Sequence, residues 1–291
     1  MANYATDWSC WKKVVTVGRM KLKQLVKDWL PPAAISLCQR LQGKGVAYSG
    51  DYASWQVALA NSTGYDSDII LKKVSSALMK VKSGEAVFER DSVLFDKVEH
   101  SFPLLAGLLR VASENEGKLS VLDFGGSLGS TYFQCRDFLS VLPQLNWCIV
   151  EQEKFVGRGR DFFESDQLRF FYTMQEAVDY IQPNVALLSS VLQYIQNPLD
   201  VIKSLISTDV QYIVIDRTPF SALSNKNWLC VQHVPSEIYQ ASYPCWIFSE
   251  AWFKQCLLDQ FEVITDFEGS DGNGHVDGLP FQFKGMIWKR R

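Results

Sequence analysis

Several features that define whole classes of protein are missing from this chain of 291 residues. No apolar run approaches the roughly 20 residues that a membrane-spanning helix needs, and the start of the chain has no signal-peptide core followed by a cleavage site of small residues. The formal net charge is only −3, so the chain lacks the overall basic field that holds a nucleic-acid backbone. We expect a protein that is not embedded in a membrane and has no nucleic acid as partner.

Cysteine and histidine are also sparse. The seven cysteines contain no Cys-x-x-Cys pair, and an odd number fits reduced thiols better than a set of disulfides. The three histidines lie far apart in the sequence, and no cysteine–histidine spacing matches a zinc site. These patterns predict a cytoplasmic protein without a bound metal ion.

The composition is that of a globular protein, with 47% hydrophobic and 21% charged residues. Residues 8–42 alternate apolar and lysine-rich positions and predict a basic amphipathic helix. Such a helix can attach to an anionic membrane surface, but we favour a helix that packs on the domain with its lysines in solvent. Three shorter helices are expected at 51–60, 68–82 and 93–112. We therefore predict that residues 1–117 form an α-helical N-terminal cap without strands, whose tryptophans and phenylalanines offer a surface for a homodimer.

The pattern changes after Gly117 to short apolar runs that alternate with helical stretches, which is typical of a parallel sheet. Strands are predicted at 119–124, 146–151, 168–172, 185–189 and 212–216, with helices at 130–142, 154–164, 174–181, 198–206 and 249–258. The stretches 261–267 and 281–289 flank a Gly/Asp loop and predict an antiparallel pair at the sheet edge. Residues 118–291 thus form a predicted α/β domain of Rossmann-like type.

The first predicted strand ends in Asp123 and runs through a glycine loop, Gly125 to Gly129, into a helix. Gly125 allows a tight turn that brings backbone N–H groups against a ligand, and Gly129 lets the helix pack closely on the sheet. The carboxylate of Asp123 suits a cationic amino group and would repel a pyrophosphate. Glu151 ends the next strand, where a carboxylate can bind both hydroxyls of a ribose.

This combination resembles the first two motifs of the class I S-adenosylmethionine-dependent methyltransferases, and the resemblance covers residues 119–291. It implies a seven-stranded, mostly parallel sheet whose last strand is antiparallel, with S-adenosylmethionine as the cofactor. Ser127 stands where the family has its central glycine, and we expect this to be tolerated if its φ stays below zero. The cofactor-binding residues that the resemblance implies are Asp123, Gly125, Gly126, Ser127, Gly129, Glu151, Gln152, Ser190 and Gln193.

A narrower resemblance links the chain to a bacterial family of methyltransferases encoded beside surface-polysaccharide genes. It implies that the methyl acceptor is a small molecule or a glycan, namely a sugar or glycolipid intermediate. It rests on the segments Val121–Gly126, Ser190–Tyr194, Asp216–Pro219 and Tyr243–Trp246, and extends into the cap through Tyr52-x-x-Trp55 and Glu89-Arg90-Asp91.

Three side chains are candidates for the transfer chemistry. His233, expected in a loop after the fifth strand, is a candidate base, although a structural histidine fits equally well. Asp216 and Arg217 follow the fifth strand directly, so Asp216 can orient a hydroxyl and Arg217 can bind an anionic acceptor; an ion pair at a strand end is the alternative. His275 is expected to be exposed in the loop between the edge strands, and His100 to cap or pack against a helix.

An aromatic wall for stacking adenine or a sugar is predicted from four side chains, although packing in the core accounts for at least half of them; they are Tyr194, Tyr239, Tyr243 and Trp246. The charged segment 89–91 is a candidate for closing over the site, although an ordinary charged loop fits equally well. Two other functions stay open at this point. A nicotinamide-dependent oxidoreductase needs Gly-x-Gly-x-x-Gly, which the glycines at 125, 126 and 129 do not supply. An inactive methyltransferase-like scaffold remains compatible, because no base stands out.

Overall fold

The computed structural model describes residues 46–64, 67–90, 92–235 and 241–291, and the fold is that of the unit Ala47–Arg291. The basic helix predicted within residues 8–42, with its proposed membrane contact, lies outside the described residues, as do Asp91 and Tyr239. In the described part of the chain, no helix is long and apolar enough to cross a bilayer, and no cluster of metal-ligating side chains occurs.

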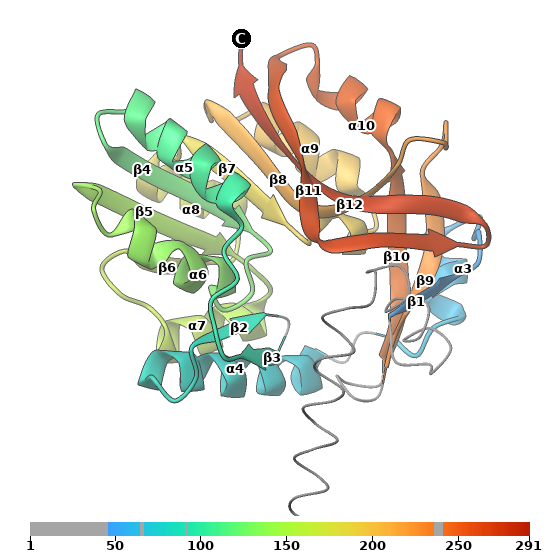
Figure 1. The fold of residues 1–291 in the computed structure, drawn as a ribbon, viewed down its shortest axis with the longest axis horizontal. Helices are drawn as coiled ribbons and strands as arrows, with labels where there is room; N and C mark the ends of the chain where they lie inside the picture. Colours follow the sequence, from blue (N-terminus) through green and yellow to red (C-terminus); the bar gives the residue numbers. More distant parts are fainter. Residues whose placement is uncertain (1–45, 65–66, 91, 236–240) are drawn as a thin grey trace, which may run out of the picture. The chain divides into compact units, whose positions relative to one another are not determined.

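A twisted sheet forms the centre of this unit (Figure 1). Seven of its strands follow the order β6-β5-β4-β7-β8-β12-β11. The neighbours from β6 to β8 are parallel, whereas β12 is antiparallel to both β8 and β11. This part confirms the mostly parallel α/β sheet. The seven strands are β4 (Lys118–Phe124), β5 (Gln144–Val150), β6 (Leu168–Phe171), β7 (Val185–Ser189), β8 (Tyr212–Ser221), β11 (Phe261–Val276) and β12 (Leu279–Arg290).

The predicted count of seven strands is wrong, because the sheet contains ten in the described residues. The additional strands are β1 (Ala47–Ser49), β9 (Trp228–Val234) and β10 (Ala241–Ser249). Strand β8 runs five residues beyond its predicted end, and its last residues pair in parallel with the end of β10. Strands β9 and β1 then add antiparallel neighbours. Pro244 lies inside β10, where a proline normally argues against a strand, which explains the missed element.

The segment before β4 is not free of strands either. Beyond β1, a short antiparallel hairpin forms from β2 (Phe88–Arg90) and β3 (Val93–Phe95). The helices there are α3 (Trp55–Ala60), α4 (Ser67–Ser83) and α5 (Phe102–Glu114). Helix α5 begins at Phe102, nine residues later than predicted at 93, because Pro103 occupies the first turn, a position that proline favours. Strands of three residues are too short to show a period, so sequence patterns miss them.

Helices cover both faces of the parallel part of the sheet (Figure 1). On one face lie α5, α6 (Ser130–Leu139) and α7 (Glu153–Phe162), and on the other α8 (Met174–Ile181), α9 (Pro198–Ile206) and α10 (Glu250–Leu257). Successive strand residues alternate between the two cores, so Leu187 belongs to the first and Leu188 to the second. Full burial of each such leucine stabilises the fold by about 1.5–3 kcal/mol.

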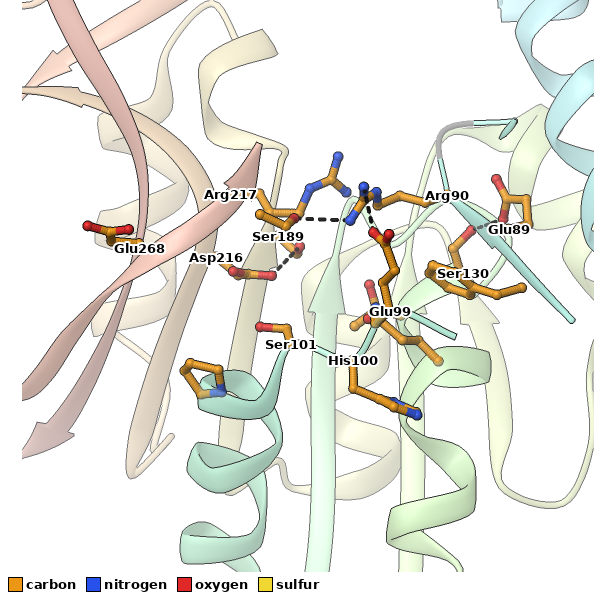
Figure 2. A pocket seen from close by; sticks show the side chains of 15 residues that line it. Glu89, Arg90, Glu99, His100, Ser101, Ser130, Ser189, Asp216, Arg217 and Glu268 are labelled. Carbon is orange, nitrogen blue, oxygen red and sulfur yellow. Dashed lines mark hydrogen bonds and ion pairs between the residues drawn. The ribbon is translucent and has the colours of Figure 1, made fainter. Parts of the chain in front are cut away.

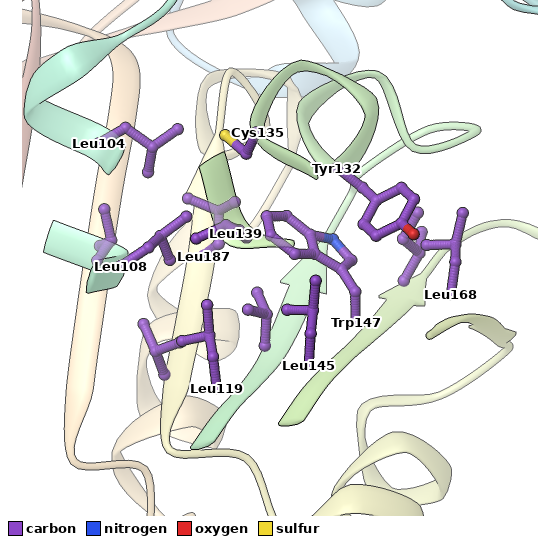
Figure 3. Packing of buried hydrophobic residues seen from close by; sticks show 14 of the residues in the cluster. Leu104, Leu108, Leu119, Tyr132, Cys135, Leu139, Leu145, Trp147, Leu168 and Leu187 are labelled. Carbon is purple, nitrogen blue, oxygen red and sulfur yellow. The ribbon is translucent and has the colours of Figure 1, made fainter. Parts of the chain in front are cut away.

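The first core is packed around Trp147 of β5, which is fully buried (Figure 3). Leu108 of α5 and Leu139 of α6 lie against the same cluster as Leu145 and Leu187 of the sheet. These contacts fix the start of α6, and with it the glycine loop, relative to the strand ends. The core therefore determines where the carboxyl ends of the parallel strands present their polar residues.

Candidate functional site

The glycine loop leads from β4 into α6, and at Gly125 and Gly126 it is packed too tightly for a side chain. Gly125 has a φ of +75°, and a Cβ there would lie 2.2 Å from Cγ2 of Val191. A Cβ on Gly126 would lie 2.4 Å from Oδ2 of Asp123. Gly129 precedes the first turn of α6 with a φ of +102°, a conformation that costs glycine little. The positive φ of Gly125 agrees with the tight turn predicted there, whereas the binding of a ligand by the loop stays a prediction.

Ser127 corrects one expectation from the sequence. Its φ is +55°, not negative, so a non-glycine residue here adopts the left-handed region. Its backbone N–H donates to Oε1 of Glu151 at 3.2 Å. The loop requires this backbone conformation to aim the N–H group at the acid, and the charge-assisted hydrogen bond offsets the strain.

Glu151 follows the last residue of β5, as predicted, and lies against the glycine loop. Its Oε2 also accepts the backbone N–H of Gln152 at 2.8 Å, at the start of α7. Burial raises the pKa of Glu151, while the two backbone hydrogen bonds act in the opposite direction. The side chain of Gln152 is exposed. The structure thus brings together the two features, loop and acid, that carried the sequence argument.

Asp123 lies behind the loop and is 1% exposed. The indole Nε1 of Trp147 donates to its Oδ2 at 2.9 Å, and its Oδ1 has no hydrogen-bond partner in the described structure. Burial is the main cause that raises the pKa of Asp123, to about 7. In this arrangement Asp123 supports Gly126 and Trp147, and its direct contact with a ligand stays a prediction.

Ser190 and Gln193 join the end of β7 to β8. The backbone N–H of Ser190 donates to the carbonyl oxygen of Asp216 at 3.0 Å. Gln193, in the short helix η1 (Leu192–Tyr194), is fully buried; its Nε2 donates to Oγ of Ser190 and to the carbonyl of Arg217, both at 3.2 Å. Its Oε1 is a second buried acceptor that lacks a partner among the described residues.

A cavity of about 230 Å³ opens at the carboxyl end of β7, beside the middle of β8 (Figure 2). This is the edge of a parallel sheet at which ligands bind in α/β folds. Ser189 and Asp216, which are paired across β7 and β8, line it together with Arg217. The other polar lining comes from β2, from the segment before α5, from the start of α6 and from β11: Glu89, Arg90, Glu99, His100, Ser101, Ser130, Thr131, Gln134, Glu268 and Ser270.

Asp216 lies inside β8, not after its end, because the strand continues to Ser221. Oγ of Ser189 donates to its Oδ2 at 3.3 Å. Burial is the largest influence on the pKa of Asp216 and raises it, while the positive charge of Arg217 and the Ser189 bond oppose the rise. A raised pKa makes the Asp216 carboxylate a stronger base, which suits it to accept a proton.

Arg217 has a φ of +49°, and its Nε donates to Oδ2 of Asp271 at 2.8 Å. Asp271 belongs to an irregular part of β11, where the register with β12 shifts between Glu268 and Asn273. The ion pair that the sequence left as the alternative for Arg217 is therefore present, with a partner from another strand.

The structure separates His233 from this cavity. His233 lies in β9, not in a loop, is exposed, and shares a hydrogen bond of 2.9 Å with Oγ of Ser49 on β1. It is not among the residues that line the cavity. The error arises because the stretch after β8 forms a strand rather than a loop. His275 is likewise in a strand, β11, although it is exposed as predicted.

Of the predicted aromatic wall, the three described side chains, Tyr194, Tyr243 and Trp246, do not line the cavity. Tyr194 and Tyr243 meet edge to face at 5.4 Å, and the hydroxyl of Tyr194 donates to Oε1 of Gln232. Trp246 stacks on Trp55 at 6.2 Å. These contacts fasten β9 and β10 to α3 and η1, which matches the alternative role in packing.

Some site residues were missed or only suspected from the sequence. Glu89, in the suspected segment 89–91, accepts a hydrogen bond of 2.6 Å from Oγ of Ser130, the first residue of α6. Arg90 pairs with Glu99 at 3.4 Å and donates to Oγ of Ser270 at 3.1 Å. The sequence signal for the β11 contribution is the Gly/Asp-rich stretch after Phe267, which has the composition of a connecting loop but belongs to the strand.

No family model matches the chain, and no curated protein matches it. Among solved structures, the N-terminal domain of EvdMO1 in the presence of SAH and D-fucose is 13% identical, over 70% of this chain and 90% of that chain, with a TM-score of 0.43. The 1,6-didemethyltoxoflavin-N1-methyltransferase of Burkholderia thailandensis, with 1,6-didemethyltoxoflavin and S-adenosylhomocysteine bound, is 11% identical, over 78% of this chain and 91% of that chain, with a TM-score of 0.37.

CalS10, an amino pentose methyltransferase of Micromonospora echinaspora with SAM bound, is 9% identical over 66% of this chain and 92% of that chain, with a TM-score of 0.41. At these identities and TM-scores the similarities assign no activity to this chain.

Proposed function

We propose that this chain is an S-adenosylmethionine-dependent methyltransferase. The observation that carries the proposal is the hydrogen bond from the N–H of Ser127 in the glycine loop to Glu151 at the end of the neighbouring strand. It forms a cradle of loop backbone and carboxylate at the carboxyl edge of a parallel sheet, a place suited to an adenosine ribose. The loop leaves no room for a Cβ at Gly125 or Gly126, which fits a ligand that approaches the backbone closely.

The donors and acceptors of the site also fit this cofactor. Asp123 and Gln193 each hold a buried oxygen without a partner among the described residues, and a buried acceptor of this kind favours a ligand that brings hydrogen-bond donors. The cofactor carries such donors on its ribose, its adenine and its amino group. When bound, it supplies a methyl group on a positively charged sulfur.

We propose further that the cavity binds the methyl acceptor, a hydroxyl group of a sugar or glycolipid intermediate of surface-polysaccharide synthesis. Hydroxyl side chains of Ser101, Ser130, Thr131, Ser189 and Ser270 line it, and carboxylates lie between them, a pattern that suits a polyhydroxyl ligand. Asp216 would take the proton that the acceptor hydroxyl loses, with Ser189 holding its Oδ2 in place. Asp216 is only 3% exposed, and a buried carboxylate interacts more strongly with a neighbouring polar group than an exposed one. We place this reaction in the cytoplasm.

The cofactor assignment is tested by isothermal titration of the purified protein with S-adenosylhomocysteine. We expect Glu151→Ala to weaken binding about 10- to 100-fold, because hydrogen bonds to a charged group contribute about 1.5–3 kcal/mol. Glu153→Ala is the matched control, since Glu153 is exposed two residues later in the first turn of α7. No heat from folded, ligand-free protein would refute the assignment and favour an inactive scaffold.

A further inference from the structure

Two residues with left-handed backbones lie where β7 ends beside β8, and neither of them is a glycine. Ser190 has a φ of +53° and Arg217 has a φ of +49°. Each directly follows one member of the pair Ser189 and Asp216, which face each other across β7 and β8 and line the cavity. Left-handed strain persists only where neighbouring groups hold it, and such residues gather at functional sites.

One buried side chain bonds both strained residues. Nε2 of Gln193 donates to Oγ of Ser190 and to the carbonyl oxygen of Arg217, each at 3.2 Å. Gln193 is 0% exposed and lies in η1 between two packed side chains, Leu192 and Tyr194. An amide buried at such a position costs free energy unless its hydrogen bonds are made. Its two bonds therefore account for a glutamine in a place that otherwise suits an apolar residue.

We propose that Gln193 is a positioning residue for the proton transfer. Its two hydrogen bonds hold Ser190 and Arg217 in their left-handed conformations. These conformations keep the residues before them, Ser189 and Asp216, directed into the cavity, where Figure 2 shows them joined by a hydrogen bond. The inference rests on the proposed function, in which Asp216 takes the proton of the acceptor hydroxyl. Gln193 acts through its neighbours and not by touching the reacting atoms.

The proton affinity of Asp216 depends on the residues that Gln193 holds. Burial is the largest influence on the pKa of Asp216 and raises it, and the charge of Asp271 adds to the rise. The positive charge of Arg217, the hydroxyl of Ser189 and the backbone N–H of Arg217 lower the pKa. A change of the left-handed backbone would move these three groups away from the carboxylate, whereas its burial would remain. Without the donors of Gln193, we therefore expect Asp216 to hold its proton more tightly.

The test is the pKa of Asp216 in the full-length protein, measured by NMR titration of its carboxyl carbon, whose signal is the one missing from Asp216→Asn. Gln193→Met keeps the length of the side chain and removes both hydrogen-bond donations, so the pKa of Asp216 should shift upward. Gln232→Met is the matched control. Gln232 is also a buried glutamine, but it bonds Tyr194 and Tyr243, so its loss should leave the pKa of Asp216 unchanged.

A rescue variant separates positioning from packing. Glycine adopts a positive φ with little strain, so Ser190→Gly added to Gln193→Met should bring the pKa of Asp216 part of the way back to the wild-type value. An unchanged pKa in folded Gln193→Met, an equal shift in Gln232→Met, or no return in the double variant would each overturn the proposal. Should Gln193→Met not fold, Gln193→Asn replaces it, because it withdraws the amide by one carbon. An upward shift of the pKa of Asp216 in that variant supports the proposal, and an unchanged pKa overturns it.

The failure of this inference can be told apart from the failure of the proposed function, because the NMR titration needs no cofactor. If the wild type binds S-adenosylhomocysteine and Gln193→Met leaves the pKa of Asp216 unchanged, the methyltransferase assignment stands and the positioning role is wrong. If the folded wild type binds no S-adenosylhomocysteine, the proposed function fails, and the inference falls with the reaction on which it rests.

Discussion

The two halves of the candidate site are built in different ways. Most of the cofactor half comes from one stretch of chain, residues 123–152, to which Ser190 and Gln193 are added. It is shaped by backbone conformation: a loop with positive φ values, and glycines at 125 and 126 that leave no room for a Cβ. The acceptor half joins β2, β8 and β11, and it is held by charged side chains such as Arg217 and Asp271. We therefore expect the first half to be sensitive to added volume and the second to changes of charge.

The largest effect is expected from Gly125→Ala. Its Cβ would meet Val191 at 2.2 Å, and its backbone has a φ of +75°. Left-handed strain of about 1–2 kcal/mol and overpacking of about 1–3 kcal/mol together lower the free energy of unfolding by roughly 2–5 kcal/mol. Urea unfolding measures this loss, and titration with S-adenosylhomocysteine should show that the variant no longer binds.

Gly84→Ala is the control, because Gly84 has a similar φ of +80° but nothing within 4 Å of its Cβ. Gly84→Ala should lower the free energy of unfolding only through the left-handed backbone strain, by about 1–2 kcal/mol. Equal losses in the two variants would mean that the packing of the loop against Val191 contributes nothing, and that the cofactor half does not depend on close packing.

The same contrast explains how much could be predicted from the sequence. Strands β4 to β7 begin and end within two residues of their predicted bounds, because strands buried on both faces are continuous apolar runs. The link between the glycine loop and Glu151 followed from a spacing within one βαβ unit. Such local patterns are what a sequence displays directly.

The acceptor half could not be predicted in this way, because its contacts join distant positions. Glu89 meets Ser130, 41 residues later, and Arg217 meets Asp271, 54 residues later. The sequence predicts a loop at His233, because the stretch after β8 shows no clear strand pattern, yet His233 lies in β9. No local period identifies which distant side chains will share a cavity.

A second prediction concerns the pH dependence that Asp123 contributes. The folded pKa is about 7, above the value of about 3.9 for an unfolded aspartate, so between these pH values the folded state holds a proton that the unfolded state has lost. The contribution of protonated Asp123 to the stability of the fold is therefore fully present below about pH 4, and it is lost as the pH rises to about 7. Asp123→Asn removes this titration, so its stability relative to wild type should rise by about 2–3 kcal/mol between pH 5 and pH 8.

Urea unfolding of both proteins across this pH range gives the difference. Asp137→Asn is the control, because the side chain of Asp137 is 85% exposed and its removal should leave the pH profile unchanged. A constant difference between Asp123→Asn and wild type at every pH would show that Asp123 is ionised in the folded protein, with its charge balanced within the loop.

The smallest effect is expected in the acceptor half, from Asp271→Asn. The side chains of Arg217 and Asp271 are 14% and 24% exposed, so their ion pair lies between a surface pair and a buried one, and we expect a loss of about 1–2 kcal/mol in urea unfolding. Asp51→Asn breaks the more exposed pair with Lys226 and should lower the free energy of unfolding by less than about 1 kcal/mol.

Losing the negative charge of Asp271 also lowers the pKa of Asp216, because that charge helps to raise it. Asp216 should therefore titrate at lower pH in Asp271→Asn than in the wild type. If Asp271→Asn changes neither stability nor the titration of Asp216, the β11 contribution does not set the charge of the cavity, and the acceptor half rests on β7 and β8 alone.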